Sequence, residues 1–132
     1  MNIEEIVMYP TQLVHVETTF INAKKVSESV STEFTISAEI KGEIMNENMG
    51  KSIINISVQN DGYQIEEEKV GIFKFEKEIE DAFRAQQFME VQGARIMWSY
   101  LREDLYTVSS KMLPKPIMLP TIDVMRTLEK AQ

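Results

Sequence analysis

The chain has 132 residues, no cysteine and a formal net charge of −7. This length is that of a single domain with a modest core, and the missing cysteines exclude disulfides, cysteine-ligated zinc and cysteine nucleophiles. The acidic charge disfavours nucleic acid and anionic lipid as partners, and no apolar run is long enough to insert into a membrane. Because "MNIEEIVMYP" lacks the basic and apolar regions of a signal peptide, we expect a cytoplasmic protein.

Alternating apolar and polar residues predict β-strands over the first sixty per cent of the chain, because successive strand side chains point to opposite faces of a sheet. His15 and Glu17 take the polar face of the first strand, within "TQLVHVETTFI". The apolar face is assigned to Val14, Val16, Thr18 and Phe20 in the first strand, Phe34, Ile36, Ala38, Ile40 and Ile44 in the second, and Ile54, Ile56 and Val58 in the third.

The connections between these strands are predicted from polar and turn residues. Residues 22–29 and 45–51 are expected to be polar loops, and Asp61-Gly62 predicts a tight type I′ hairpin turn. The fourth strand, 63–75, changes its apolar face between Ile65 and Val70, which predicts a bulge or a strand break near Glu67–Lys69. We therefore expect a four-stranded antiparallel β-meander.

Helical periodicity follows the strands. Acidic residues precede an apolar pattern from about residue 78, and a second helix is expected after Gly93. One stripe of this second helix consists of Ala94, Met97, Leu101, Leu105, Val108 and Met112, whereas Ile96, Trp98, Tyr100 and Tyr106 lie off it. Because a small chain has little to bury such a helix against on two sides, the pattern predicts self-association.

Prolines end the helical region. Pro114, Pro116 and Pro120 predict an extended crossover over residues 113–120, and Thr121 is the expected N-cap of a helix over 121–130. The whole chain, residues 1–132, is thus predicted to be one α+β domain, with strands in about 12–76 and helices in about 78–112 before the crossover. Met118 lies in the proline-bounded loop and is expected at the surface.

No pattern predicts catalysis. His15 is the only histidine, so no multi-histidine metal site can form, and a solvent-facing strand residue is the expected role. "GKS" at 50–52 resembles the end of a phosphate-binding loop, but Met45 stands where its first glycine is required. We expect no enzyme, no cofactor and no metal.

From about residue 12 onward the order of elements and several motifs resemble the SecB family of protein-export chaperones. "VGIFKF" at 70–75 is similar to the family's end of strand four, and "TTFINA" fits its first strand. The segment 93–124 resembles the family's long helix and proline-rich crossover. The positions that hold this pattern are Tyr100, Arg102, Glu103, Pro116, Leu119 and Pro120.

The resemblance implies a homotetramer, a dimer of dimers, with the long helix packed at an oligomer interface. It also implies an ATP-independent chaperone, without a cofactor, that binds unfolded or precursor polypeptides through apolar grooves for protein export. On the sheet the expected groove includes Phe34, Ile36, Ala38, Val70 and Ile72, and by extrapolation the helix and crossover add Met97, Leu101, Met118 and Leu119. The SecA motor is an implied partner, docked on an acidic face with Glu17 and Glu66.

The chain also departs from the family pattern. Ile21 stands where another acid is expected, Gln64 stands where an apolar contact is expected, and the sequence ends without an extended polar tail. These departures favour a SecB-like chaperone dedicated to one client, such as an antitoxin. From a different class, a non-chaperone interaction or assembly module on the same fold is the remaining alternative.

Overall fold

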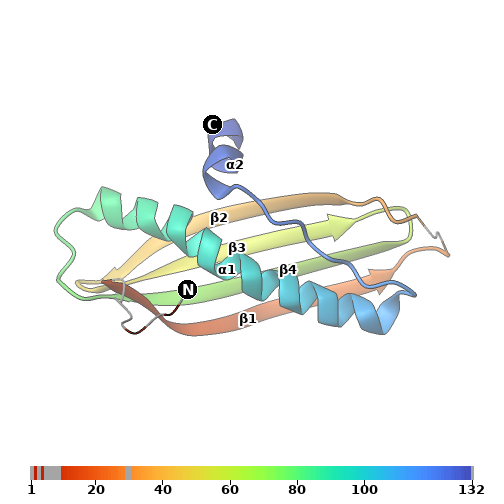
Figure 1. Cartoon of the computed structure of the whole chain (residues 1–132), viewed down its shortest axis with the longest axis horizontal. Coiled ribbons are helices and arrows are strands. Elements are labelled where there is room, and N and C mark those ends of the chain that lie inside the picture. The colour runs from red at the N-terminus through yellow and green to blue at the C-terminus, as the bar shows by residue number, and fades with distance from the viewer. Residues whose placement is uncertain (1, 3, 5–9, 29–30, 132) are drawn as a thin grey trace.

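The computed structural model describes Asn2, Glu4 and residues 10–28 and 31–131. Most of the segment that bears on a signal peptide, and the end of the predicted 22–29 loop, lie outside the described residues. An antiparallel sheet is followed by one long and one short helix (Figure 1). The strands are β1 (Thr11–Lys25), β2 (Thr35–Asn46), β3 (Met49–Gln59) and β4 (Tyr63–Phe75), and the helices are α1 (Ala82–Met112) and α2 (Val124–Ala131).

The α+β class and the four antiparallel strands followed by helices are as predicted, but the strand order corrects the predicted meander. The order across the sheet is β1-β4-β3-β2, so only β2, β3 and β4 form a meander and β1 returns to pair with β4. The alternation of a strand determines which face each side chain takes but not which strand lies beside it. As a result β4 is central, and β1 and β2 are the two edges.

The register corrects two further predictions. No bulge interrupts β4 near Glu67, because its pairing with β3 runs without a shift from Met49 to Gln59. The irregularities lie instead in β1, between Leu13 and His15 and between Thr18 and Phe20. They turn Phe20 onto the face away from α1, so the predicted shared face of β1 applies to Val16 and Thr18 but not to Phe20.

The connections are shorter than predicted: residues 22–25 of the predicted 22–29 loop belong to β1, and the hairpins are tighter and use a different turn. Only Glu47 and Asn48 separate β2 from β3, because β2 continues to Asn46 and β3 begins at Met49. The predicted type I′ turn at Asp61-Gly62 is wrong, since none of the described residues has a positive φ. Instead the Asn60 side chain closes the turn by accepting hydrogen bonds from the backbone N–H groups of Gly62 and Tyr63, at 2.7 and 3.2 Å.

Helix α1 is one continuous helix, although two were predicted. Gly93 lies inside it, and a Cβ there would stand 2.0 Å from Ser52 Oγ, so this glycine permits close packing on β3 rather than a break. The N-cap is Asp81, whose carboxylate accepts from the N–H of Arg84 at 3.1 Å. The acidic residues that come before the apolar pattern lie outside the helix, and none lies in its first turn.

The short helix α2 begins at Val124, three residues after the predicted cap. Asp123, not Thr121, caps it: the Asp123 carboxylate accepts from the N–H of Arg126 at 3.1 Å. Within the described part of the chain, no helix is long and apolar enough to cross a membrane.

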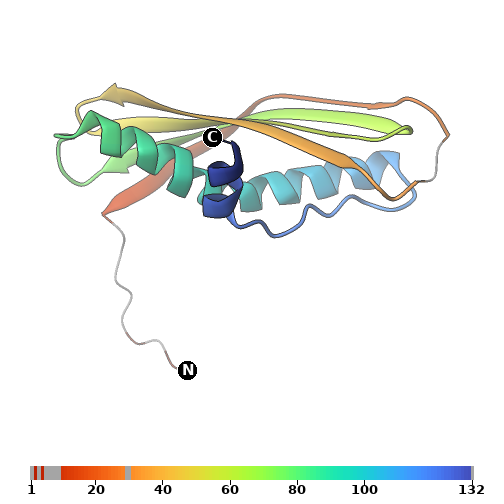
Figure 2. The ribbon, with the colours of Figure 1, turned by 90° about the horizontal axis from the view of Figure 1, so that it is seen from above.

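The core lies between one sheet face and α1, which crosses the sheet diagonally as a single layer (Figures 1 and 2). The first half of α1 contacts β2 and β3 near Gly42 and Ser52, and its second half reaches β4 at Lys69. The predicted apolar positions of β3 and four of the predicted helix stripe are buried there: Ile54, Ile56, Val58, Ala94, Met97, Leu101 and Leu105.

Candidate functional site

After α1, residues 113–123 form an extended connector that runs back along the helix on its β2 side (Figure 1). Two side chains of α1 hold its backbone: Trp98 Nε1 donates to the Pro120 carbonyl at 2.9 Å, and Arg102 Nε donates to the Leu119 carbonyl at 3.0 Å. Leu119 is fully buried, whereas Met118 next to it is 66% exposed, as its sequence context predicts. The connector is thus a fixed strip that presents one large apolar side chain to solvent.

The β2 part of the predicted groove lies on the same side of α1. Ile36 and Ala38 pair with Val58 and Ile56 of β3, so they point to the α1 face of the sheet. Phe34 and Ile36 are half-buried against the core, and Ala38 is exposed. Because β2 is an edge strand, these side chains lie beside an unpaired backbone edge.

The other predicted groove residues lie elsewhere. Met97, Leu101 and Leu119 are fully buried in the core, where they support the surface without forming part of it in the single chain. Val70 and Ile72 lie on the outer face of the sheet, meaning the face away from α1, where they pair with Glu17 and His15 of β1. The structure therefore brings Phe34, Ile36, Ala38 and Met118 to one side of the molecule and distributes the remaining five residues between the core and the outer face.

Both predicted acidic residues lie on the outer face. Glu17 stands 3.5 Å from His15 Nε2, and Glu66 accepts from Gln64 Nε2 at 3.1 Å. Glu66 also lines a shallow cavity of about 360 Å³ together with Glu39 and Phe20, but Glu17 does not. The outer face can thus accept hydrogen bonds from cationic groups around one exposed aromatic ring.

A second apolar surface was predicted only on its helix side, from Ile96 and Tyr100 off the main stripe. It lies between the other edge strand and α1, and we call it the β1 flank; its residues are Leu13, Val16, Ile21, Ala23, Ile96 and Tyr100. Ile96 and Tyr100 precede Asp104 by two turns and one turn of α1, so they share the helix side that faces Thr18 and Lys69. Ile21, Ile96 and Tyr100 are about 40% exposed. The strand side of this surface could not be read from the sequence, because two bulges in β1 change the alternation of its apolar residues.

A charged cluster lies beneath α1 where the helix passes over β4. Glu67 is fully buried, and its Oε2 lies 3.5 Å from Lys69 Nζ and accepts from Thr18 Oγ1 at 3.2 Å. Lys69, also buried, contacts Asp104 of α1. The pKa of Glu67 is raised to about 8; burial is the main cause, the nearby Asp104 carboxylate also raises it, and Lys69 lowers it. A sequence signal for this cluster exists, since alternation places Glu67 and Lys69 on the same face as Ile65.

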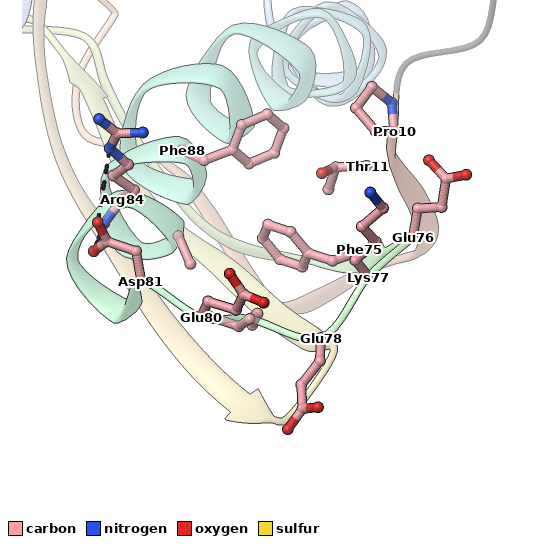
Figure 3. A pocket seen from close by; sticks show the side chains of 12 residues that line it. Pro10, Thr11, Phe75, Glu76, Lys77, Glu78, Glu80, Asp81, Arg84 and Phe88 are labelled. Carbon is pink, nitrogen blue, oxygen red and sulfur yellow. Dashed lines mark hydrogen bonds and ion pairs between the residues drawn. The ribbon is translucent and has the colours of Figure 1, made fainter.

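A cavity of about 590 Å³ lies where β4 ends and α1 begins (Figure 3). The rings of Phe75 and Phe88 form its apolar wall, 5.8 Å apart between centroids in an edge-on arrangement. Its rim is acidic, and Arg84 on that rim is paired with Asp81 at 3.7 Å. Across the described ranges of the chain, no group of three acidic, histidine or cysteine residues could hold a metal ion.

Comparison with known proteins identifies the fold. No family model and no curated protein matches the sequence. The structure is similar to the Mycobacterium tuberculosis SecB-like chaperone Rv1957, solved in complex with a ChAD peptide from the HigA1 antitoxin, with a TM-score of 0.70, 14% identity, and coverage of 86% of this chain and 88% of that one. It is also similar to a protein of unknown function from Streptococcus agalactiae, with a TM-score of 0.56, 11% identity, and coverage of 84% and 97%. These likenesses show that the chain has a SecB-like fold.

Proposed function

We propose that this protein is an ATP-independent molecular chaperone, a holdase that binds unfolded or precursor polypeptides through apolar surfaces beside α1. The main support is the fold that it shares with a chaperone solved with a bound peptide. Exposed apolar side chains on the helix-covered side of the sheet, such as Met118 and Tyr100, add to it. Many small apolar contacts, each worth about 25 cal/mol per Å² of buried area, can hold an unfolded chain without a specific pocket.

The proposed client surface is the β2 side of the molecule. An extended client segment can pair with the free edge of β2, and its side chains can then contact Phe34, Ile36 and Ala38 on one side and Met118 on the other. Backbone pairing does not depend on the sequence of the client, so this mode suits a protein that accepts varied unfolded chains.

The β1 flank is the proposed site of self-association. β1 is an edge strand of 15 residues. On the side of the sheet that faces α1, Ile21 of β1 and Ile96 and Tyr100 of α1 are partly exposed. A second copy of the chain would cover these side chains and pair the free strand edge, in line with the proposed homotetramer built as a dimer of dimers. The protein would function in the cytoplasm without a cofactor.

Delivery of clients for export is the first proposed role, with the SecA motor as the partner of the outer face. Glu17 and Glu66 would supply the acidic contacts to a basic motor surface. Replacing Glu66 with lysine should then weaken motor binding and leave client binding unchanged, as measured by titration of each partner. If client binding fell equally, Glu66 would have a structural role instead.

A chaperone dedicated to one antitoxin is the second candidate. The specific support is that the mycobacterial chaperone of the same fold was solved with an antitoxin peptide. The two roles differ in client range, because an export chaperone should protect several unrelated precursors and a dedicated chaperone only one.

Light scattering of denatured proteins diluted into buffer without nucleotide tests the proposal. The protein should suppress aggregation of a denatured precursor at near-stoichiometric amounts. Met118→Asp should weaken this suppression, whereas Met45→Asp, at a methionine that is 46% exposed at the end of β2, should not. Circular dichroism of both variants would verify that they fold. If no precursor or antitoxin is protected, the holdase proposal is wrong and an assembly module on this fold takes its place.

A further inference from the structure

The charged cluster beneath α1 contains carboxylate oxygens that no hydrogen-bond donor reaches with regular geometry. Oε1 of Glu67 is buried and accepts no hydrogen bond, and Oδ2 of Asp104 contacts Lys69 Nζ without accepting a hydrogen bond of regular geometry. Buried acceptors without donors are costly, and so is a buried net charge. With both carboxyl groups ionised, one ammonium group would leave a net charge of −1 under the helix.

One proton would remove both costs. On Oε1 of Glu67 it would turn an acceptor without a partner into a donor toward Asp104, and it would make the cluster neutral. We propose that Glu67 and Asp104 share one proton in the folded protein, and that the protonated cluster clamps the second half of α1 to β4. This clamp is a property of the single chain and does not depend on the proposed holdase function.

The surroundings of Glu67 support this assignment on every side. Lys69 faces it from β4, Asp104 faces it from α1, and the Thr18 hydroxyl faces it from β1. On β3 its pairing partner is Ile56, which cannot titrate. Burial, together with the nearby Asp104 carboxyl group, raises the pKa of Glu67. The pKa of Asp104 is lowered, despite burial, by its contacts with Glu67 and Lys69. The proton therefore belongs to Glu67.

The sign of the pH dependence follows from the raised pKa. An unfolded chain releases the Glu67 proton near pH 4.5, whereas the folded chain retains it up to about pH 8. The stabilisation is complete below the lower value, declines between the two as pH rises, and is lost above the higher one. Deprotonation then leaves an extra negative charge beneath α1, so the helix segment around Asp104 should separate from the sheet more often.

Urea unfolding at a series of pH values tests the clamp. Glu67→Gln keeps the shape and the donor but has no proton to lose. Glu66→Gln is the matched control, because it makes the same substitution on the opposite face of the same strand. Between about pH 5 and 8 the unfolding constant of wild type should rise by up to tenfold per pH unit relative to that of Glu67→Gln. Glu66→Gln should retain the wild-type slope. Equal slopes in all three proteins would overturn the proposal.

Hydrogen exchange adds a local readout. Corrected for intrinsic rates, exchange around Asp104 in wild type should quicken as the pH rises from about 5 to about 8 and level off above that, and exchange around Met89 should not change. If Glu67→Gln fails to fold, carbon-13 NMR of the wild-type glutamate carboxyl groups decides instead. One carboxyl group should titrate near pH 8, and titration of every glutamate in the ordinary acidic range would overturn the proposal.

Discussion

The two halves of α1 are attached to the sheet by different forces. In the first half, backbone and side chains approach closely: a Cβ on Gly42 would stand 2.7 Å from the Gln86 carbonyl, and Ser52 Oγ donates to the Met89 carbonyl at 2.6 Å. In the second half, a buried charged cluster accompanies the apolar contacts of Leu101 and Leu105. The first attachment is steric and insensitive to pH, and the second depends on ionisation.

This difference assigns a role to each half. The first half contains Gly93 and packs against Gly42 of β2; it fixes the position of the helix on β2 and β3, where no space remains for adjustment. The second half borders the connector and the β1 flank, which are the two proposed interaction surfaces. A helix held by charges at that point can respond to its environment while its other end stays in place.

Removal of the cluster's cation should have the largest effect. Lys69→Met leaves the buried carboxyl groups without a counter-charge, and we expect a loss of about 3–5 kcal/mol in the free energy of unfolding. Lys51→Met is the control, because Lys51 is part-exposed and pairs with Glu43 at 3.5 Å. That variant should lose about 1 kcal/mol or less in urea denaturation. Equal losses would show that the cluster does not hold the helix.

A methyl group added to β2, where the first half of α1 packs against it, should have an intermediate effect. Gly42→Ala places Cβ against the backbone carbonyl of Gln86, which cannot rotate away, so we expect a loss of about 1–3 kcal/mol in unfolding free energy. Gly71→Ala is the comparison, since its Cβ would meet Met97 Sδ at 2.5 Å, near the end of a flexible side chain. Thermal unfolding should rank Gly42→Ala as the less stable. The reverse order would contradict a steric attachment.

Loss of one hydrogen bond between α1 and the connector should have the smallest effect. Trp98→Phe keeps a ring but removes the donor to the Pro120 carbonyl, and we expect a loss of about 0.5–1.5 kcal/mol with faster hydrogen exchange in the connector. Tyr100→Phe, at a ring that is 41% exposed on the β1 flank, should change neither quantity. Unchanged exchange in Trp98→Phe would mean that the connector is held by its buried side chains alone.

Much of the fold was predictable because local patterns encode it. The alternation of β3 and the stripe from Ala94 to Leu105 both describe the buried face that the structure shows. The strand order and the two bulges of β1 were not predictable, because both depend on contacts between residues far apart in the sequence. Gly93 was misjudged as a break for the same reason, since its partner Ser52 lies on another element.

The candidate site was only partly predictable. Met118 was correctly expected at the surface, because prolines on both sides of it rule out a helix. The charged cluster was missed because a buried ion pair violates the usual distribution of charged residues, and only Glu66 of the run 66–68 was assigned a role, on an acidic docking face. Glu66 is on that outer face, and Glu67 is under the helix.

Site-specific photo-crosslinking would show directly whether an unfolded chain binds on the α1 side of the sheet beside β2. A photo-reactive residue would replace Met118 or Ala38 on that side, or Ser57 on the outer face, and each protein would be mixed with a denatured precursor without nucleotide. We expect adducts from positions 118 and 38 and none from position 57. Adducts from position 57 as abundant as those from position 118 would contradict it.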